Sequence, residues 1–458
     1  MANNAFSSKV GLIMAAAGSA VGLGNIWKFP YVAGENGGGA FLLVYLACVV
    51  ALGLPMVATE FLIGQRSRHS AFGAFRQLNG NNRWQWLSWM CLTTSVLIMG
   101  FYFVVTGWCF NYLAEAVVNT FHAMSTDQLT AHFNGFIHSD LRMMLFSLVP
   151  IVLTAAVLWF DVNKGIEQLS KILMPLLLVM MILMVIRVLM LDNSMQGLRF
   201  FFHPDFSKIT PNVILEAMGQ CFFSLSIGMG ALITYGAYMP PKQRVVYTSV
   251  QVAVLDTLVA VLAGVIIFPA VFSFGFNPEE GPKLAFIVLP AILEQMSLPW
   301  FSSVLFFSLL CIAALTSTIS LMEVSVAYMV EVSEHWAKKN PRIKPLNRHK
   351  SVLLVAVVTI AITSLCVLSM TDAREWLSFG GHNLFDLLDD ITSCYLMPLG
   401  ALGMSIFVAW KMPLEGENGL TQNAKGLHRW VCIIYQQMIR WIIPIVIVVI
   451  FLYGLDIL

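Results

Sequence analysis

The chain of 458 residues is 58% hydrophobic and only 11% charged, whereas soluble domains carry about 25% charged residues. Its formal net charge is +1 and no dense basic stripe stands out, so the sequence gives no argument for a nucleic-acid partner. This composition excludes an ordinary soluble enzyme and predicts a polytopic membrane protein.

Eleven segments are apolar enough, and long enough, to cross a hydrocarbon core that needs about 20 residues per helix. In chain order they are 9–33, 38–64, 88–118, 142–160, 169–190, 212–238, 246–274, 299–331, 351–370, 384–410 and 431–454. Lysine and arginine are more frequent in the connections on the side of the N-terminus, which places that terminus in the cytoplasm. Eleven spans then place the C-terminus outside. We predict an all-α membrane protein whose single transporter domain covers residues 1–458.

Two of the predicted spans contain unusual runs of glycine. Residues 18–25 read GSAVGLGN and residues 219–236 read GQCFFSLSIGMGALITYG, with Gly22 and Gly228 lying 206 residues apart. Irregular backbone at membrane depth survives only where it is buried in protein or lines a cavity. The alternative is that these small residues allow close helix packing. The matched pair, five spans apart, instead favours an inverted repeat of residues 9–190 and 212–410, with an additional helix at 431–454 and a substrate site between the interruptions.

Three runs resemble the neurotransmitter:sodium symporter family, in particular its bacterial amino-acid transporters. They are AAAGSAVGLGNIWKFPYVAGENGGGAF (15–41), GQCFFSLSIGMGALITY (219–235) and AALTSTISLMEV (313–324). The resemblance implies a five-plus-five inverted repeat with helices 1 and 6 unwound at mid-membrane. It also implies one amino acid bound beside two sodium ions, and a location in the bacterial cytoplasmic membrane.

The resemblance assigns oxygen ligands to both ions, as a hard cation requires. For the first site it implies Ala20, Asn25, Ser224 and Asp256, and for the second it implies Gly18, Val21, Ala313, Thr316 and Ser317. The alternative for the two hydroxyls of the second site is that they bond back to their own helix.

Asp256 departs from the family pattern, since many relatives have asparagine there. Ala260 stands where chloride-dependent relatives hold the anion partly with a serine. Our hypothesis is that Asp256 supplies the negative charge covalently and that transport needs no chloride. A proton carried outward on Asp256 is an alternative that the sequence leaves open.

The resemblance also implies a substrate pocket. Free N–H groups at a broken helix favour an anionic group, so the substrate carboxylate is expected at Leu23, Gly24 and the Tyr102 hydroxyl. The ammonium group is expected at the carbonyls of Ala20, Phe223 and Ser224 and the hydroxyl of Ser226. The side-chain pocket is expected to contain Ile98, Tyr102, Phe223, Met229, Ser317 and Leu321.

The type of substrate follows from the residues of this pocket. Monoamine transporters of the family carry aspartate at the position of Gly22, and glycine leaves room for a carboxylate brought by the substrate. Because the pocket is largely apolar, it predicts a neutral hydrophobic or aromatic L-amino acid.

The resemblance also implies gates on the outer and inner sides of the substrate site. The resemblance implies an outer ion pair between Lys28 and Asp386, with Phe223 as a lid and Gln220 nearby. On the inner side it implies Glu331, although Asn3 and Phe6 stand where the family has arginine and tryptophan. Glu60 is expected to accept hydrogen bonds from the interrupted sixth span, and Glu323 has no assigned role.

Together these implications predict a sodium-coupled symporter working by alternating access, with no enzymatic activity. Its partners are then the amino acid and the lipid bilayer, with no obligatory protein partner. A channel would need a polar stripe along a span, which is absent. A receptor that resembles a transporter but moves no substrate is an alternative that the sequence leaves open.

Overall fold

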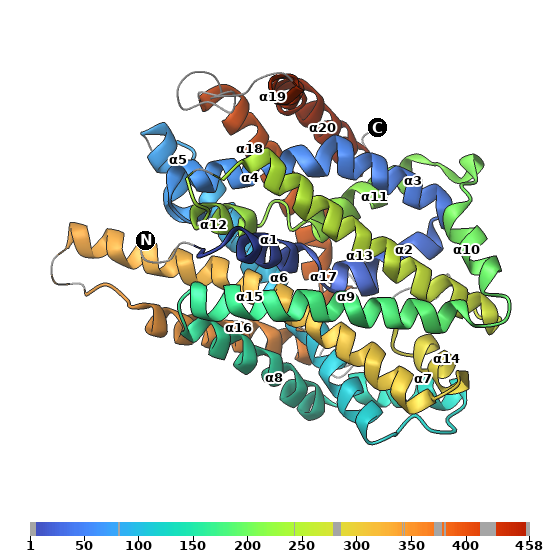
Figure 1. Cartoon of the computed structure of the whole chain (residues 1–458). Coiled ribbons are helices and arrows are strands. Elements are labelled where there is room, and N and C mark those ends of the chain that lie inside the picture. Colours follow the sequence, from blue (N-terminus) through green and yellow to red (C-terminus); the bar gives the residue numbers. More distant parts are fainter. Residues whose placement is uncertain are drawn as a thin grey trace.

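The computed structural model describes residues 6–80, 83–241, 243–277, 285–340, 342, 344–370, 378–379, 382–412 and 427–454. Long helices run side by side through the molecule (Figure 1). Within the described residues, the only strands are the antiparallel pair β1 (Ser378–Phe379) and β2 (His382–Asn383). The expectation of an all-α protein therefore holds apart from this short pair.

The first five predicted spans coincide with helical segments. They are α1 (Lys9–Ala20) with η1 (Gly24–Lys28) and α2 (Phe29–Glu35); α3 (Gly39–Cys48) with η2 (Val49–Gly53) and α4 (Leu54–Ser67); α6 (Gln85–Val117); α8 (Asp140–Trp159); and η3 (Asn163–Glu167) with α9 (Gln168–Leu189).

The remaining spans also coincide with helices. They are α11 (Pro211–Ser224) with α12 (Ala231–Ala237); α13 (Val245–Ser273); α15 (Pro299–Lys339); α16 (Arg348–Ser369); α17 (Leu384–Asp390) with η7 (Ile391–Leu396) and α18 (Met397–Lys411); and α19 (Leu427–Gln437) with η8 (Met438–Ile442) and α20 (Ile443–Gly454).

Within the described part of the chain, nine helices have the length and hydropathy to cross a membrane, or ten when the bent pair formed by α1 with η1 and α2 counts as one span. The sixth predicted segment is not among them, because α11 and α12 are separated by residues 225–230. Two of the eleven predicted spans are thus interrupted helices, and these are the two that carry the glycine runs.

Short helices connect the long ones at their ends. They are α5 (Ala71–Asn79), α7 (Thr126–Ile137), α10 (Ser194–Phe202), η4 (Phe206–Lys208) and α14 (Val288–Gln295). Local signals specify some of them: in α7 the Ser125 hydroxyl and the Gln128 side chain form a reciprocal capping box, which satisfies two N–H groups of the first turn.

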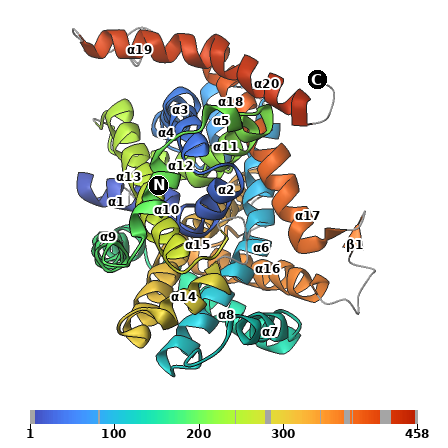
Figure 2. The same ribbon diagram turned by 90° about the vertical axis from the view of Figure 1, so that its right-hand side faces the viewer.

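The long helices α6 and α15 pack against each other, and α1 packs against α9, α13 and α15. Figure 2 shows α19 and α20 along one edge of the bundle, beside α18. Buried apolar side chains form one continuous cluster that reaches from α1 to α20. This packing brings the interruption after α1 close to the interruption after α11.

Candidate substrate and ion site

The first interruption begins where α1 ends at Ala20. Val21 has an extended conformation, with φ −70° and ψ 105°, and the two helical halves are bent by 48°. The N–H of Leu23 donates to the hydroxyl of Tyr102 at 3.0 Å, and the N–H of Gly22 donates to Oδ1 of Asn25 at 3.1 Å. The break therefore leaves peptide N–H groups free to bond to side chains, that of Tyr102 from α6 and that of Asn25 from the same span.

The second interruption lies between Ser224 and Ala231. Ser226, Gly228 and Gly230 have φ values of +56°, +91° and +79°, a region that glycine enters freely and other residues rarely. These left-handed residues end α11 and redirect the chain before α12 begins.

Glu60 of α4 holds this second interruption. Its side chain is fully buried, and its Oε1 accepts the N–H of Gly228 at 2.7 Å. A Cβ atom at Gly228 would lie 2.5 Å from the carbonyl oxygen of Met397, so a larger residue would also collide with α18. The hydrogen bond predicted between Glu60 and the sixth span is present.

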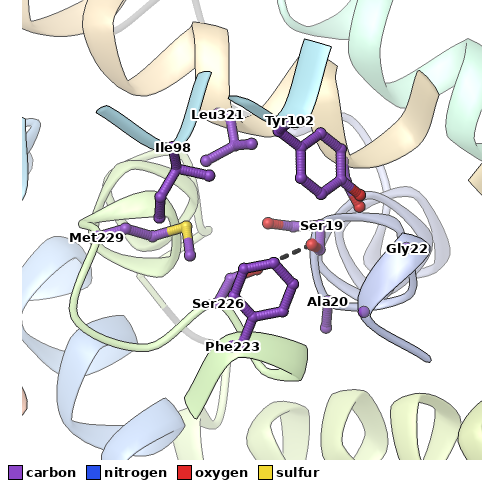
Figure 3. A pocket seen from close by; sticks show the side chains of 11 residues that line it. Ser19, Ala20, Gly22, Ile98, Tyr102, Phe223, Ser226, Met229 and Leu321 are labelled. Atoms are coloured by element: carbon purple, nitrogen blue, oxygen red, sulfur yellow. Dashed lines mark hydrogen bonds between the residues drawn. The ribbon is translucent and has the colours of Figure 1, made fainter. Parts of the chain in front are cut away.

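A small cavity lies between the two interruptions. Figure 3 shows Ile98, Leu321 and Met229 on one side, Tyr102 and Gly22 on the other, and the ring of Phe223 between them. The Ser226 hydroxyl donates to the carbonyl of Ser19 at 2.9 Å and so ties the two breaks together. The lining consists of Ser19, Ala20, Gly22, Gly24, Ile98, Tyr102, Phe223, Ser226, Met229, Ser317 and Leu321.

Most of the residues that the resemblance assigned to the substrate line this cavity, and two do not. Leu23 does not line the cavity, and its N–H donates to the Tyr102 hydroxyl. The Ser224 hydroxyl lies against Asp256 instead. Ser19 lines the cavity without having been assigned to it. Its hydroxyl is buried and has no hydrogen-bond partner among the residues that the structure describes, and its place next to Ala20, where α1 ends, was the signal that could have identified it.

Asp256 of α13 is the centre of a buried polar cluster at the position of the first implied sodium site. Ser224 Oγ lies 2.9 and 2.8 Å from its two carboxylate oxygens, and Asn25 Nδ2 lies 2.7 Å from Oδ1. The Tyr45 hydroxyl lies 3.4 Å from Oδ2. All four side chains are buried, and each partner of Asp256 is neutral. The structure brings Asn25, Ser224 and Asp256 together, while Tyr45 is a member that the sequence did not indicate.

The second implied sodium site joins α1 to α15. Thr316 Oγ1 lies 2.9 Å from the carbonyl of Ala313 and 3.3 Å from the carbonyl of Val21. It also lies 3.2 Å from the carbonyl of Ile312 in its own helix, the contact that the alternative expected. Ser317 Oγ lies 3.5 Å from the same Val21 carbonyl. A Cβ atom at Gly18 would be 3.4 Å from Cβ of Thr316, which places the fifth assigned residue beside the others.

Lys28 lies at the outer-gate position that the sequence indicated. Its Nζ is 3.0 Å from a carboxylate oxygen of Asp389 and 4.7 Å from the ring centroid of Phe223. Gln220 Nε2 donates to the carbonyl of Gly24 at 2.6 Å. The cation therefore covers the aromatic ring that borders the cavity.

The partner assigned to Lys28 was wrong by one helical turn. The ion pair of Lys28 is formed with Asp389 of α17 and not with Asp386. Residues three apart lie on the same face of a helix, so matching by position could not choose between the two carboxylates. The Asp386 N–H instead donates to Asn383 at the start of α17.

Glu331 caps a connecting helix. Its carboxylate accepts the N–H of Ser70 at 2.8 Å, the hydroxyl of Ser70 at 2.8 Å and the N–H of Gly73 at 3.2 Å. These groups belong to the N-terminus of α5, where a negative charge is favourable. Asn3 lies outside the described residues, and Phe6 packs against Tyr235 at a centroid distance of 5.9 Å. Among its described contacts, Glu331 thus binds α5.

Glu323, which had no assigned role, forms a buried ion pair with Arg348. The two guanidinium nitrogens lie 3.0 and 2.7 Å from the two carboxylate oxygens, a two-pronged geometry that fixes both planes. The Tyr238 hydroxyl donates to the same carboxylate at 2.8 Å. The network connects α15, α16 and the end of α12.

Comparisons with known proteins agree with this arrangement. The model of the sodium:neurotransmitter symporter family matches residues 3–128 and 119–457. The chain belongs to this family. A sodium-dependent transporter of Bacillus subtilis, YhdH, is 36% identical over 452 residues, which cover 98% of this chain and 96% of the relative.

A solved structure and a distant relative extend the comparison. The crystal structure of MhsT in complex with L-phenylalanine has a TM-score of 0.88 and 37% sequence identity, covering 98% of this chain and 99% of that one. The human sodium- and chloride-dependent taurine transporter is 25% identical over 84% of this chain, which spans 67% of that protein. The chain is therefore a multi-pass membrane protein of a sodium-dependent transporter family, and not an enzyme.

Proposed function

We propose that this protein is a symporter that couples the entry of sodium to the uptake of a neutral hydrophobic or aromatic L-amino acid, by alternating access and without chloride. The observation that carries the proposal is the pair of interrupted helices around one cavity, with buried oxygen clusters on either side of it.

The pocket chemistry supports an amino acid as the substrate. The Tyr102 hydroxyl, which accepts the N–H of Leu23, and the N–H of Gly24 offer donors to a carboxylate, and the carbonyl groups of the second break offer acceptors to an ammonium group. Ile98, Met229 and Leu321 supply apolar contacts for the side chain. The similar protein MhsT was solved with L-phenylalanine, which agrees with an apolar substrate.

The two oxygen clusters are proposed as the sodium sites. In the first, Asp256 is a carboxylate whose neighbours are neutral. Because a charge near the bilayer centre costs at least about 2.5–3.5 kcal/mol, such a group is expected to pair with a cation. In the second, the oxygens of Val21, Ala313 and Thr316 are neutral ligands of the kind that a hard cation such as sodium prefers.

The chloride-independent mechanism rests on the same carboxylate. Asp256 is buried beside the first sodium cluster, and Ala260, one helical turn later, has no group that could donate a hydrogen bond to an anion. A covalently attached negative charge then balances the sodium ion. In this respect we expect the protein to differ from the taurine transporter, which is named as chloride-dependent.

The proposed topology has eleven spans in a bacterial cytoplasmic membrane, with the N-terminus inside and the C-terminus outside. The repeats are residues 9–190 and 212–410, and residues 431–454 form the extra span. Counting α11 and α12 together as one interrupted span supports this number.

Uptake into liposomes tests the proposal. Purified protein is reconstituted, and labelled L-phenylalanine and L-leucine are compared with L-glutamate and L-lysine, with and without an inward sodium gradient. We expect saturable uptake of the two apolar amino acids only, collapsing without the gradient and equal in chloride and gluconate buffers. Binding without accumulation would indicate a receptor, and strict chloride dependence would refute the assignment of Asp256.

A further inference from the structure

The carboxylate of Glu167 binds the segment that precedes α1. Oε2 accepts the N–H of Ser7 at 2.7 Å, and Oε1 accepts the hydroxyls of Ser7 and Ser8 at 2.7 and 2.8 Å. Lys171, one turn later on α9, donates to Oε1 at 2.6 Å. Both oxygens of one side chain are thus engaged by donors, three of which come from the N-terminal segment.

The burial of Glu167 makes these contacts strong. Its side chain has no exposed surface, and hydrogen bonds to an ionised group are worth more than neutral ones, especially where water is excluded. A Cβ atom at Gly11 would lie 2.2 Å from Oε1 of Glu167, so α1 lies directly against the carboxylate. Ser8 is also the N-cap of α1, since its hydroxyl accepts the N–H of Gly11 at 3.0 Å.

The other end of α1 carries the oxygens proposed for the second sodium ion. This helix has only twelve residues, and its last turn places Gly18 beside Thr316 of α15. The helix packs between α9 and α15 in the bundle (Figures 1 and 2). Glu167 of η3 therefore holds its N-terminal end, while Gly18 near its C-terminal end lies against both Met174 of α9 and Thr316 of α15.

We propose that Glu167 is a positioning residue that keeps the inner half of the first span closed in this protein. The inference deepens the proposed function, because it concerns how that transporter closes its inner path. The carboxylate at the family position, Glu331, binds α5 instead. Opening then requires two events at opposite ends of one helix: release of sodium from Thr316 and Val21, and separation of Ser7 and Ser8 from Glu167.

Hydrogen exchange measured by mass spectrometry tests the contact directly, in sodium-free buffer and with the full chain in detergent. Glu167→Gln replaces one acceptor oxygen by an NH₂ group, which must face either the Ser7 N–H or Lys171. We expect exchange of residues 6–20 to accelerate at least tenfold. The matched control is Glu331→Gln, which also neutralises a buried carboxylate and should accelerate exchange in α5 while leaving residues 6–20 unchanged.

A second variant keeps the test decisive if Glu167→Gln fails to fold. Ser7→Ala combined with Ser8→Ala removes two of the three N-terminal donors and leaves the ion pair with Lys171 in place. We expect a smaller acceleration in the same residues, with unchanged exchange in α6 and α15. The proposal is overturned if Glu167→Gln and the double variant leave residues 6–20 at the wild-type rate, or if Glu331→Gln affects them equally.

Sodium dependence separates positioning from a structural role. When a ligand binds only one conformation, its apparent dissociation constant rises as the population of that conformation falls. We therefore expect Glu167→Gln to raise the sodium concentration for half-maximal uptake at least threefold, with little change in thermal stability. An unchanged sodium dependence contradicts the positioning role. If wild-type protein shows no sodium-driven uptake, the proposed function fails, while the exchange experiment still decides the contact.

Discussion

Gly22 offers the sharpest test of the cavity, because the structure specifies what an added methyl group would meet. A Cβ atom there would lie 2.1 Å from Ser317 Oγ and 2.8 Å from the Tyr102 hydroxyl. Both distances are far below ordinary van der Waals contact. Gly22→Ala therefore forces the Ser317 side chain away from the Val21 carbonyl, which it approaches to 3.5 Å, and disturbs the pocket and the second sodium cluster together.

The magnitude follows from the cost of overpacking. An extra methyl group in a well-packed interior typically costs about 1–3 kcal/mol. Where this cost falls on the substrate-bound conformation and not equally on every folded conformation, about 1.4 kcal/mol per tenfold change converts it to a roughly 5- to 150-fold loss in uptake efficiency, the maximal rate divided by the half-saturating substrate concentration.

The assay is sodium-driven uptake of labelled L-phenylalanine into liposomes, normalised to the amount of reconstituted protein. Gly219→Ala is a matched control, because a Cβ atom at Gly219 of α11 meets no atom within 4 Å. It should transport at nearly the wild-type rate. Wild-type efficiency in Gly22→Ala would show that the close contact with Ser317 is not a feature of the working transporter.

Three further predictions concern buried and gating charges. Asp256→Asn should reduce sodium-driven uptake at least tenfold in chloride-free buffer, and full retention of uptake there would contradict the proposed role of its charge. Asp389→Asn should accelerate dissociation of bound L-phenylalanine several-fold in a filter-binding assay, whereas Asp386→Asn should change the dissociation rate little. A larger effect of Asp386→Asn would instead support the pairing of Lys28 with Asp386 that was inferred from sequence. Arg348→Met leaves Glu323 buried, with Tyr238 as its one remaining hydrogen-bond donor among the described residues, a change that typically costs about 3–5 kcal/mol. The midpoint of thermal unfolding should therefore fall, and it should recover when Glu323→Gln is added. A midpoint equal to that of the wild type would argue against the buried ion pair.

The local sequence determined much of this architecture. Hydropathy located each long helix to within several residues, because burying about 20 apolar residues in lipid dominates the free energy of a span. The glycine runs identified both interruptions for different reasons. In the second, Gly228 adopts a φ of +91° that glycine reaches without strain. In the first, Gly22 leaves no room for a Cβ atom, which would lie 2.1 Å from Ser317 Oγ. Matched positions brought Asn25, Ser224 and Asp256 to one cluster, and Thr316 beside Val21.

Other features depended on the tertiary structure. Which carboxylate of α17 pairs with Lys28 is decided by the rotation of that helix against the first span, and Asp389 rather than Asp386 faces the cation. The contact between Tyr45 and Asp256 spans 211 positions in sequence, and the contact between Ser7 and Glu167 spans 160. No local pattern encodes such pairs.

The division has a physical reason. A membrane span and a break within it are properties of a continuous stretch of chain, because backbone hydrogen bonding and transfer into lipid act residue by residue along the helix. The partner of a buried charge is chosen by how helices rotate and cross, and this depends on the packing of side chains from the entire bundle. The sequence by itself therefore determined the helices and their interruptions, while only the tertiary structure decided which buried carboxylate holds which segment.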